Sequence, residues 1–307
     1  MNRLSLADLL EATIRLYRRA PLPLLLISAV VQVPAGFASG VLGATSQEAF
    51  LRLGTAGPRD ISAADVQALL GLILGFLVLA IVVGVASYLS GAATMHAAAT
   101  MLTGDRASVR GAYGAVLRKL GALLGSLLLS AGALIALALG LVIILVLVAL
   151  ILGPTQAGIG GPAAFATIVL LVAFVVGIVF LSVRWAVSVP AIMIEGRGPA
   201  EGLGRSWRLV TGSTWRVLGI MLVFSIAVGL LLTLAQQLVL TLPLGDLSSL
   251  TPGTVFYGAA IAITTTLAAP ILPIMVTLLF LDLRFRGEGV KEIFPGGSPA
   301  ATGPGPS

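Results

Sequence analysis

Six long apolar stretches constrain the fold of this chain more than any other feature of its sequence. They lie near residues 22–43, 66–91, 120–152, 163–189, 215–242 and 254–281. Each is long enough for a helix to cross a hydrocarbon core of about 30 Å, which takes about 20 residues. Strands of a membrane barrel are about ten residues long and alternate in polarity, and these stretches do not alternate. The sequence therefore predicts an all-α, polytopic membrane protein with six transmembrane helices.

The composition agrees with a membrane protein and limits the partners and chemistry to expect. Charged residues make up 10% of the 307 residues, whereas they are about a quarter of a soluble domain. In a membrane protein, a net charge of +6 points to anionic lipid head groups rather than to nucleic acid. A protein partner or a homo-oligomer is also possible. The absence of cysteine excludes disulfides and thiolate metal sites.

The positions of the basic residues predict how the chain is oriented. Sixteen of the eighteen Lys and Arg residues fall on the side of the six spans that carries both termini, and two fall on the other side. Loops rich in Lys and Arg stay in the cytoplasm. We therefore expect a multi-pass protein of the cytoplasmic membrane with both termini cytoplasmic.

Three short amphipathic segments precede the first, third and fifth apolar stretches. They read "LSLADLLEATIRLYRRAPL", "ASVRGAYGAVLRKLGALL" and "GPAEGLGRSWRLVTGSTWRVL". Offsets of 103 and 193 residues align two apolar positions and one arginine, namely Leu10, Tyr113 and Leu203; Ile14, Leu117 and Trp207; and Arg15, Arg118 and Arg208. Each segment predicts a short helix on the membrane surface that leads into a two-span hairpin.

These segments divide the chain into three expected repeats, about 4–102, 103–195 and 196–292, within a single membrane domain of residues 1–292. In the first segment, Ser5 and Asp8 form a capping-box pattern, and Glu11 and Arg15 form an i,i+4 pair. In the third segment, Glu201 and Arg205 repeat that spacing. Residues 293–307 are rich in Pro and Gly and carry no charge, so we expect a disordered tail.

Two sets of residues are candidates for function. The first set is a basic surface for an anionic lipid or a partner, although the same residues would also serve simply as interfacial anchors: Arg15, Arg118, Arg205, Arg208, Trp207 and Arg216. The second set could line a transport cavity, although ordinary helix packing and snorkelling of the arginine explain it too: Gln32, Arg184, Gln236, Gln237 and Pro270. The GxxxG spacings at Gly36, Gly71 and Gly121 permit close helix contact within or between chains.

The sequence contains few residues that could form a catalytic or metal site. Metal and acid–base sites need converging His, Asp or Glu side chains. Every carboxylate lies outside or at the edge of an apolar stretch, and His96 is the single histidine. We expect no catalytic residue, no metal and no cofactor.

Three stretches carry a resemblance to a known family. They are "LSLADLLEATIRLYRRAPL", "PAIMIEGRGPAEGLGRSWRLVTGSTWRVLGI" and "LLFLDLRFRGEG". The chain resembles, up to about Glu292, a bacterial membrane domain that is attached to some glycerophosphoryl diester phosphodiesterases and also occurs alone. This resemblance implies a helical bundle of undetermined activity, since hydrolysis in those enzymes belongs to a separate soluble barrel. We expect a scaffold or accessory role in envelope or lipid organisation, and the alternative is a small-solute or lipid transporter.

Overall fold

The computed structural model describes residues 5–55, 63–152, 161–243 and 251–288, and these residues form eleven helices and no strand. The expected tail at residues 293–307 lies outside this range. In chain order the helices are α1 (Leu6–Arg19), α2 (Pro21–Thr55), α3 (Ala63–Leu102), α4 (Val109–Arg118), α5 (Leu120–Leu152), α6 (Pro162–Arg184), α7 (Ser188–Glu195), α8 (Pro199–Val210), α9 (Thr214–Leu240), α10 (Pro252–Ala268) and α11 (Ile271–Glu288).

Six segments of the described chain are long and apolar enough to cross a membrane. They are Pro21–Gly43, Val66–Leu102, Leu120–Val148, Ala164–Glu195, Thr214–Leu240 and Pro252–Arg286. The prediction of an all-α protein with six spans is confirmed.

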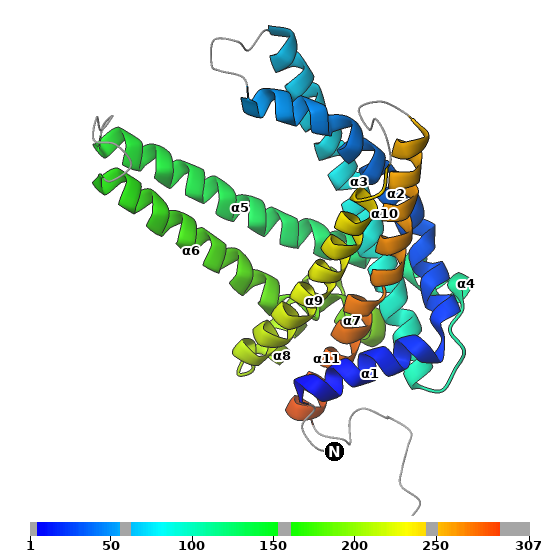
Figure 1. Cartoon of the computed structure of the whole chain (residues 1–307). Coiled ribbons are helices and arrows are strands. Elements are labelled where there is room, and N and C mark those ends of the chain that lie inside the picture. Colours follow the sequence, from blue (N-terminus) through cyan, green and yellow to red (C-terminus); the bar gives the residue numbers. More distant parts are fainter. Residues whose placement is uncertain (1–4, 56–62, 153–160, 244–250, 289–307) are drawn as a thin grey trace, which may run out of the picture.

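The fourth and sixth spans are each broken into two helices, whereas the sequence predicted one continuous helix for each span. Pro190 explains the break between α6 and α7, because a proline ring clashes with the carbonyl four residues earlier, here that of Ala186. Pro270 lies between α10 and α11 and cannot donate a helical hydrogen bond. The breaks allow α7 and α11 to turn away from the directions of α6 and α10 (Figure 1).

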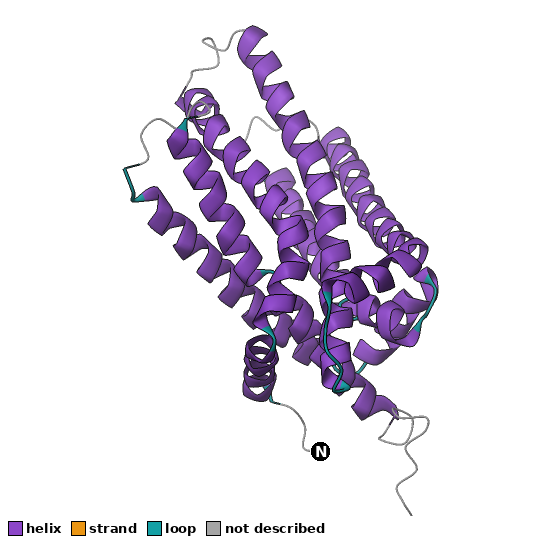
Figure 2. Ribbon diagram, turned by 90° about the vertical axis from the view of Figure 1, so that its right-hand side faces the viewer, coloured by secondary structure: helices purple, strands orange, loops and turns teal. Residues whose placement is uncertain are grey.

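The predicted surface segments form short helices, α1, α4 and α8. Ser5 and Asp8 make the expected capping box at the start of α1. Together with α7, these helices lie toward the end of the bundle that carries the N-terminus (Figure 1); Figure 2 shows the same end, marked by the N-terminus, from the side. We call this region, with the adjoining ends of α6, α9 and α11, the basic end.

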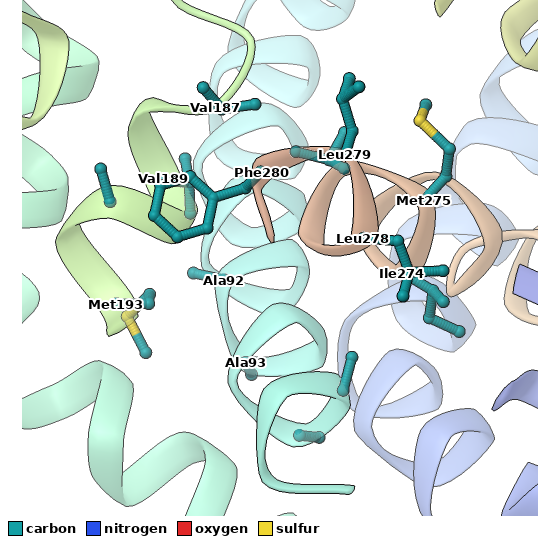
Figure 3. Packing of buried hydrophobic residues seen from close by; sticks show 14 of the residues in the cluster. Ala92, Ala93, Val187, Val189, Met193, Ile274, Met275, Leu278, Leu279 and Phe280 are labelled. Carbon is teal, nitrogen blue, oxygen red and sulfur yellow. The ribbon is translucent and has the colours of Figure 1, made fainter. Parts of the chain in front are cut away.

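The core of the protein lies at the basic end, where α3, α7 and α11 meet. Leu279 and Phe280 of α11 are fully buried, as are Ala92 and Ala93 of α3. Figure 3 shows Phe280 pointing toward α7, with the small alanines of α3 beside it. Alanine at these positions lets the α3 backbone approach both neighbours, so α7 is part of the core and not a surface loop.

Glycines bring α2 and α10 into close contact. A methyl group added at Gly36 would lie 2.7 Å from the Cα of Ala262, and one added at Gly40 would lie 2.8 Å from the Cα of Gly258. The first GxxxG spacing therefore serves contact within one chain. Around Gly71 and Gly75 there is open space, so the second spacing makes no such contact in the described chain.

The hairpin of α5 and α6 extends away from α2, α3 and α10 (Figure 1). Its apolar side chains are largely exposed, for example Leu128 at 71% and Phe165 at 72%. Large apolar surfaces of this kind are stable in hydrocarbon and not in water.

Candidate functional site

The carboxylate of Glu195, at the end of α7, is the centre of an ion cluster at the basic end. Arg205 of α8 donates to both of its oxygens, from Nη2 at 2.9 Å to Oε1 and from Nε at 3.0 Å to Oε2. Arg197 donates to Oε2 at 2.6 Å, and Nε of Arg284 lies 3.7 Å from Oε1. The side chain of Glu195 is 8% exposed and that of Arg205 is 11% exposed. Since buried charges need partners, this cluster fixes α7, α8 and α11 relative to one another.

A second cluster forms around Asp282 of α11, which is 6% exposed. Arg216 at the start of α9 donates to its Oδ2 at 2.8 Å, and Nε of Arg286 lies 3.0 Å from the same oxygen. These pairs fix α9 on α11. No local sequence pattern predicts either cluster. Glu195 and Arg205 are ten residues apart, and Asp282 and Arg216 are sixty-six residues apart.

Lys119, between α4 and α5, stabilises the end of α7. Its ammonium group donates to the carbonyls of Ile192 at 3.1 Å and Met193 at 2.8 Å. Both carbonyls belong to the last turn of α7, where that of Ile192 also accepts from the backbone N–H of Gly196 at 3.1 Å. Burial, and to a smaller extent the neighbouring Arg118, lowers the pKa of Lys119. Lys119 is thus part of the framework and is not an open basic site.

Ser206 of α8 holds the break between α6 and α7. Its hydroxyl group donates to the carbonyl of Arg184 at 2.7 Å and accepts from the backbone N–H of Val187 at 3.2 Å. Ser206 is fully buried. These two hydrogen bonds fix the backbone from which the Arg184 side chain extends.

The guanidinium group of Arg184 lies between aromatic rings at the end of α6. Its Cζ is 5.0 Å from the ring centre of Phe180 and 4.9 Å from that of Trp207. Nη1 donates to the hydroxyl group of Thr211 at 2.5 Å. Nε is buried and has no hydrogen-bond partner among the described residues. Unlike the two clusters, this cation has no carboxylate within 4.0 Å in the described part of the chain.

Arg184 closes one end of an apolar cleft between α6 and α9. The cleft has a volume of about 410 Å³. Val176, Val179 and Phe180 line it from α6, while Trp215 and Leu218 line it from α9. Arg184 and Thr214 supply polar groups at its basic end. A cleft of this shape can hold an apolar chain with a polar group at one end.

The predicted basic surface divides into exposed and buried residues. Arg15, Arg118 and Arg208 are exposed at the ends of their helices, and Arg15 pairs with Glu11 as expected. Arg205 and Arg216, by contrast, are held in the two ion clusters.

The second of the two aligned apolar positions lies outside the core in each short helix. Ile14, Leu117 and Trp207 are 50%, 67% and 38% exposed. In α8 the buried residues are instead Gly202, Ser206 and Val210. Val210 is buried while Trp207 is exposed, and Gly202 lets the buried face of α8 pack tightly against Ile192.

The predicted cavity residues lie on separate elements. On α2, Gln32 donates to Ser87 at 3.3 Å; on α9, Gln236 donates to Tyr257 at 2.6 Å. Gln237 is exposed, and Pro270 is buried at the break between α10 and α11. Of the five residues, Arg184 alone lines the cleft between α6 and α9.

No group of three or more His, Cys, Asp and Glu side chains that could hold a metal ion occurs among the described residues. The carboxylates of Glu195 and Asp282 already accept hydrogen bonds from arginines. Their arrangement is typical of structural ion pairs.

Six segments long and apolar enough to cross a membrane, most of them with largely exposed surfaces, define an integral membrane protein of the helical, polytopic class. Residues 163–293 match the family model described as the membrane domain of glycerophosphoryl diester phosphodiesterase. The match confirms the predicted resemblance over α6 to α11, which include the cleft and both ion clusters. The N-terminal stretch that also carried the resemblance lies outside the matched residues. No curated protein and no solved structure matches the chain.

Proposed function

We propose that this chain is a non-enzymatic scaffold or accessory protein that organises anionic lipid at the cytoplasmic face of the cell membrane. The observation that carries the proposal is the exposure of an apolar side chain next to an arginine near the end of each short helix. Ile14 precedes Arg15, Leu117 precedes Arg118, and Trp207 precedes Arg208. Such a pair places an apolar group toward acyl chains and a cation toward head groups.

The proposal includes the arrangement in three repeats. It is supported by the buried positions of the short helices, which coincide under the same offsets of 103 and 193 residues. Leu9, Ala112 and Gly202 are buried, as are Thr13, Val116 and Ser206. An equivalent face thus packs inward in each short helix. The third short helix follows an additional element, α7, that has no counterpart before α4.

Lipid organisation is favoured over transport because the polar residues of the spans have partners of their own. A transport cavity would need Gln32, Gln236 and Pro270 to contribute to one polar path. The two glutamines instead hydrogen-bond Ser87 and Tyr257, as residues that join helices in membranes do. Enzymatic activity is disfavoured because arginines occupy the buried carboxylates.

A charge-removal experiment tests the proposal. Arg15, Arg118 and Arg208 are replaced together by glutamine, and the protein is extracted with its surrounding lipid by an amphipathic polymer. Mass spectrometry of the extracted phospholipid should show less enrichment of anionic over zwitterionic species than for the wild type. The matched control, Arg52→Gln with Arg59→Gln, removes charge from the opposite predicted side and should leave the enrichment unchanged. Equal enrichment in all three proteins would refute the lipid role.

The orientation has an independent test. The chain has no cysteine, so single cysteines can be placed at Arg208 and at Pro252 without a background signal. A membrane-impermeant thiol reagent added to intact cells should label the cysteine at position 252 and not that at position 208. Labelling of both positions, or of position 208 alone, would contradict the cytoplasmic placement of the basic end.

A further inference from the structure

Arg184 differs from the other arginines that are partly enclosed at the basic end. Arg205 and Arg216 lie against carboxylates that neutralise them, whereas Arg184 lies against the rings of Phe180 and Trp207. Aromatic rings stabilise a cation by at most a few kcal/mol and do not neutralise its charge. The buried Nε–H has no acceptor in the described chain, and a buried donor without an acceptor is unfavourable. The charge of Arg184 is therefore not neutralised by any carboxylate of the described chain.

The cleft determines what kind of anion can reach this position. Arg184 lies at the end of an apolar channel whose lining includes Val176, Val179 and Leu218. These residues belong to two membrane spans, so hydrocarbon is the medium beside the cleft. Trp215, which is 84% exposed, lies at the level where tryptophan meets head groups in membrane proteins. The ligand must therefore combine an acyl chain with an anionic oxygen group.

We propose that the cleft between α6 and α9 binds one anionic glycerophospholipid, with an acyl chain along the valines of α6 and the phosphate at Arg184. The phosphate accepts from Nη2, which donates to no described residue, while Nη1 keeps its hydrogen bond to Thr211. The hydroxyl group of Thr214, which also lines the cleft, is within the polar end of the site. This inference rests on the proposed lipid function and deepens it, because it names a single bound lipid in place of a general preference of the surface.

The site is distinct from the exposed surface of the short helices. Arg15 and Arg118 meet lipid from outside the bundle, while Arg184 is fixed by Ser206 and by two aromatic rings. A rigid guanidinium fork with two free donors selects a phosphate by geometry as well as by charge. Binding at Arg184 should therefore saturate at one lipid per chain. The exposed surface of the short helices should instead contact many lipids that exchange with the bilayer.

Native mass spectrometry of the purified full chain tests this inference. The protein in detergent is titrated with phosphatidylglycerol, with phosphatidylcholine and with glycerol 3-phosphate. We expect one saturable phosphatidylglycerol, bound on the order of tenfold more tightly than phosphatidylcholine. Arg184→Gln should remove that difference, because the choline cation of phosphatidylcholine offsets the attraction of its phosphate to Arg184, whereas phosphatidylglycerol keeps a net negative charge.

A second pair of variants tests the acyl chain separately and does not alter Arg184. Val176→Trp fills the cleft from an exposed position, and Leu171→Trp adds a similar ring on α6 outside the cleft lining. We expect Val176→Trp to weaken phosphatidylglycerol binding at least several-fold and Leu171→Trp to leave it unchanged. If Arg184→Gln does not fold, as judged by its elution and thermal transition, this pair still decides the question.

The outcomes separate this inference from the proposed function. Wild-type affinity for phosphatidylglycerol in both Arg184→Gln and Val176→Trp would overturn the cleft site and leave the surface of the short helices in place. Tight binding of glycerol 3-phosphate that Val176→Trp does not affect would overturn the lipid as ligand in favour of a soluble anion. A wild-type protein that retains no phospholipid would overturn both proposals.

Discussion

Glu195 offers the sharpest test of how the basic end is held together. Replacing it with glutamine keeps the shape of the side chain but removes the charge that Arg205, Arg197 and Arg284 share. Arg205 is 11% exposed and the Arg284 side chain is 19% exposed, so neither can be fully hydrated after the change. Leaving a buried ion without its partner costs about 3–5 kcal/mol.

A matched control is available in the same protein. Glu11 and Arg15 form an ion pair whose side chains are 69% and 75% exposed. A pair of this kind on a helix surface contributes about 0.3–0.5 kcal/mol, because water screens both charges. Glu11→Gln is therefore the same chemical change in a setting where it should cost roughly a tenth as much.

The thermal transition of the detergent-purified protein measures the difference. With a shift of about 2 °C or more for each kcal/mol, Glu195→Gln should unfold at least about 6 °C below the wild type, while Glu11→Gln should stay within about 1 °C. The double variant Glu195→Gln with Arg205→Gln should recover part of the loss, because it also removes the buried cation that faced the carboxylate of Glu195. Equal shifts for Glu195→Gln and Glu11→Gln would refute the argument that burial gives the cluster its strength.

Three further changes have expected outcomes. Gly36→Ala should destabilise the contact of α2 with α10 by about 1–3 kcal/mol, whereas Gly75→Ala, which meets open space, should be neutral or slightly stabilising; both are measured by thermal unfolding in detergent. Lys119→Met should cost about 1–3 kcal/mol in the same assay, because the carbonyl of Met193 loses the Lys119 donor and that of Ile192 keeps only the N–H of Gly196. Burial raises the pKa of Tyr113 above 10.0, so the stability that its hydroxyl group contributes is complete below pH 10 and is lost as the pH rises through the raised value. Tyr113→Phe should remove that part of the loss of stability at alkaline pH. A thermal transition with the same pH dependence in the wild type and the variant would show that Tyr113 is not the group responsible.

The apolar pattern of the sequence was sufficient to predict the class of fold. Length and hydropathy decide whether a segment can cross a bilayer, and both are local properties of the chain. The short helices were also predictable, because Ser5 and Asp8 cap α1 with groups three residues apart. The two breaks were harder to locate, because a proline in a membrane helix ends it in one place and only bends it in another. Pro34 lies inside α2, whereas Pro270 separates two helices.

The candidate site depended on contacts that no local pattern contains. Arg205 was predicted from an i,i+4 spacing to pair with Glu201, but its bidentate partner is Glu195 on another helix. The sequence left Arg184 as either a cavity residue or a snorkelling cation, and the rings on either side of it come from α6 and α8. A sequence can identify an arginine near the end of a span. The packing of α8 is needed to show that Arg205 contacts a carboxylate and Arg184 contacts aromatic rings.

The distribution of carboxylates makes one end of this protein rigid and leaves cations there for the proposed contact with lipid. Asp282 and Glu195 are buried, and each is matched with more than one arginine. Buried cations are neutralised first because an unpaired charge costs most where water is absent. Of the other cations, some are exposed, such as Arg118 and Arg208, where lack of a partner costs little, whereas Arg184 lies beside aromatic rings. An arginine of the second kind is stable only if the surroundings supply its anion, and the surroundings of a membrane span are lipid.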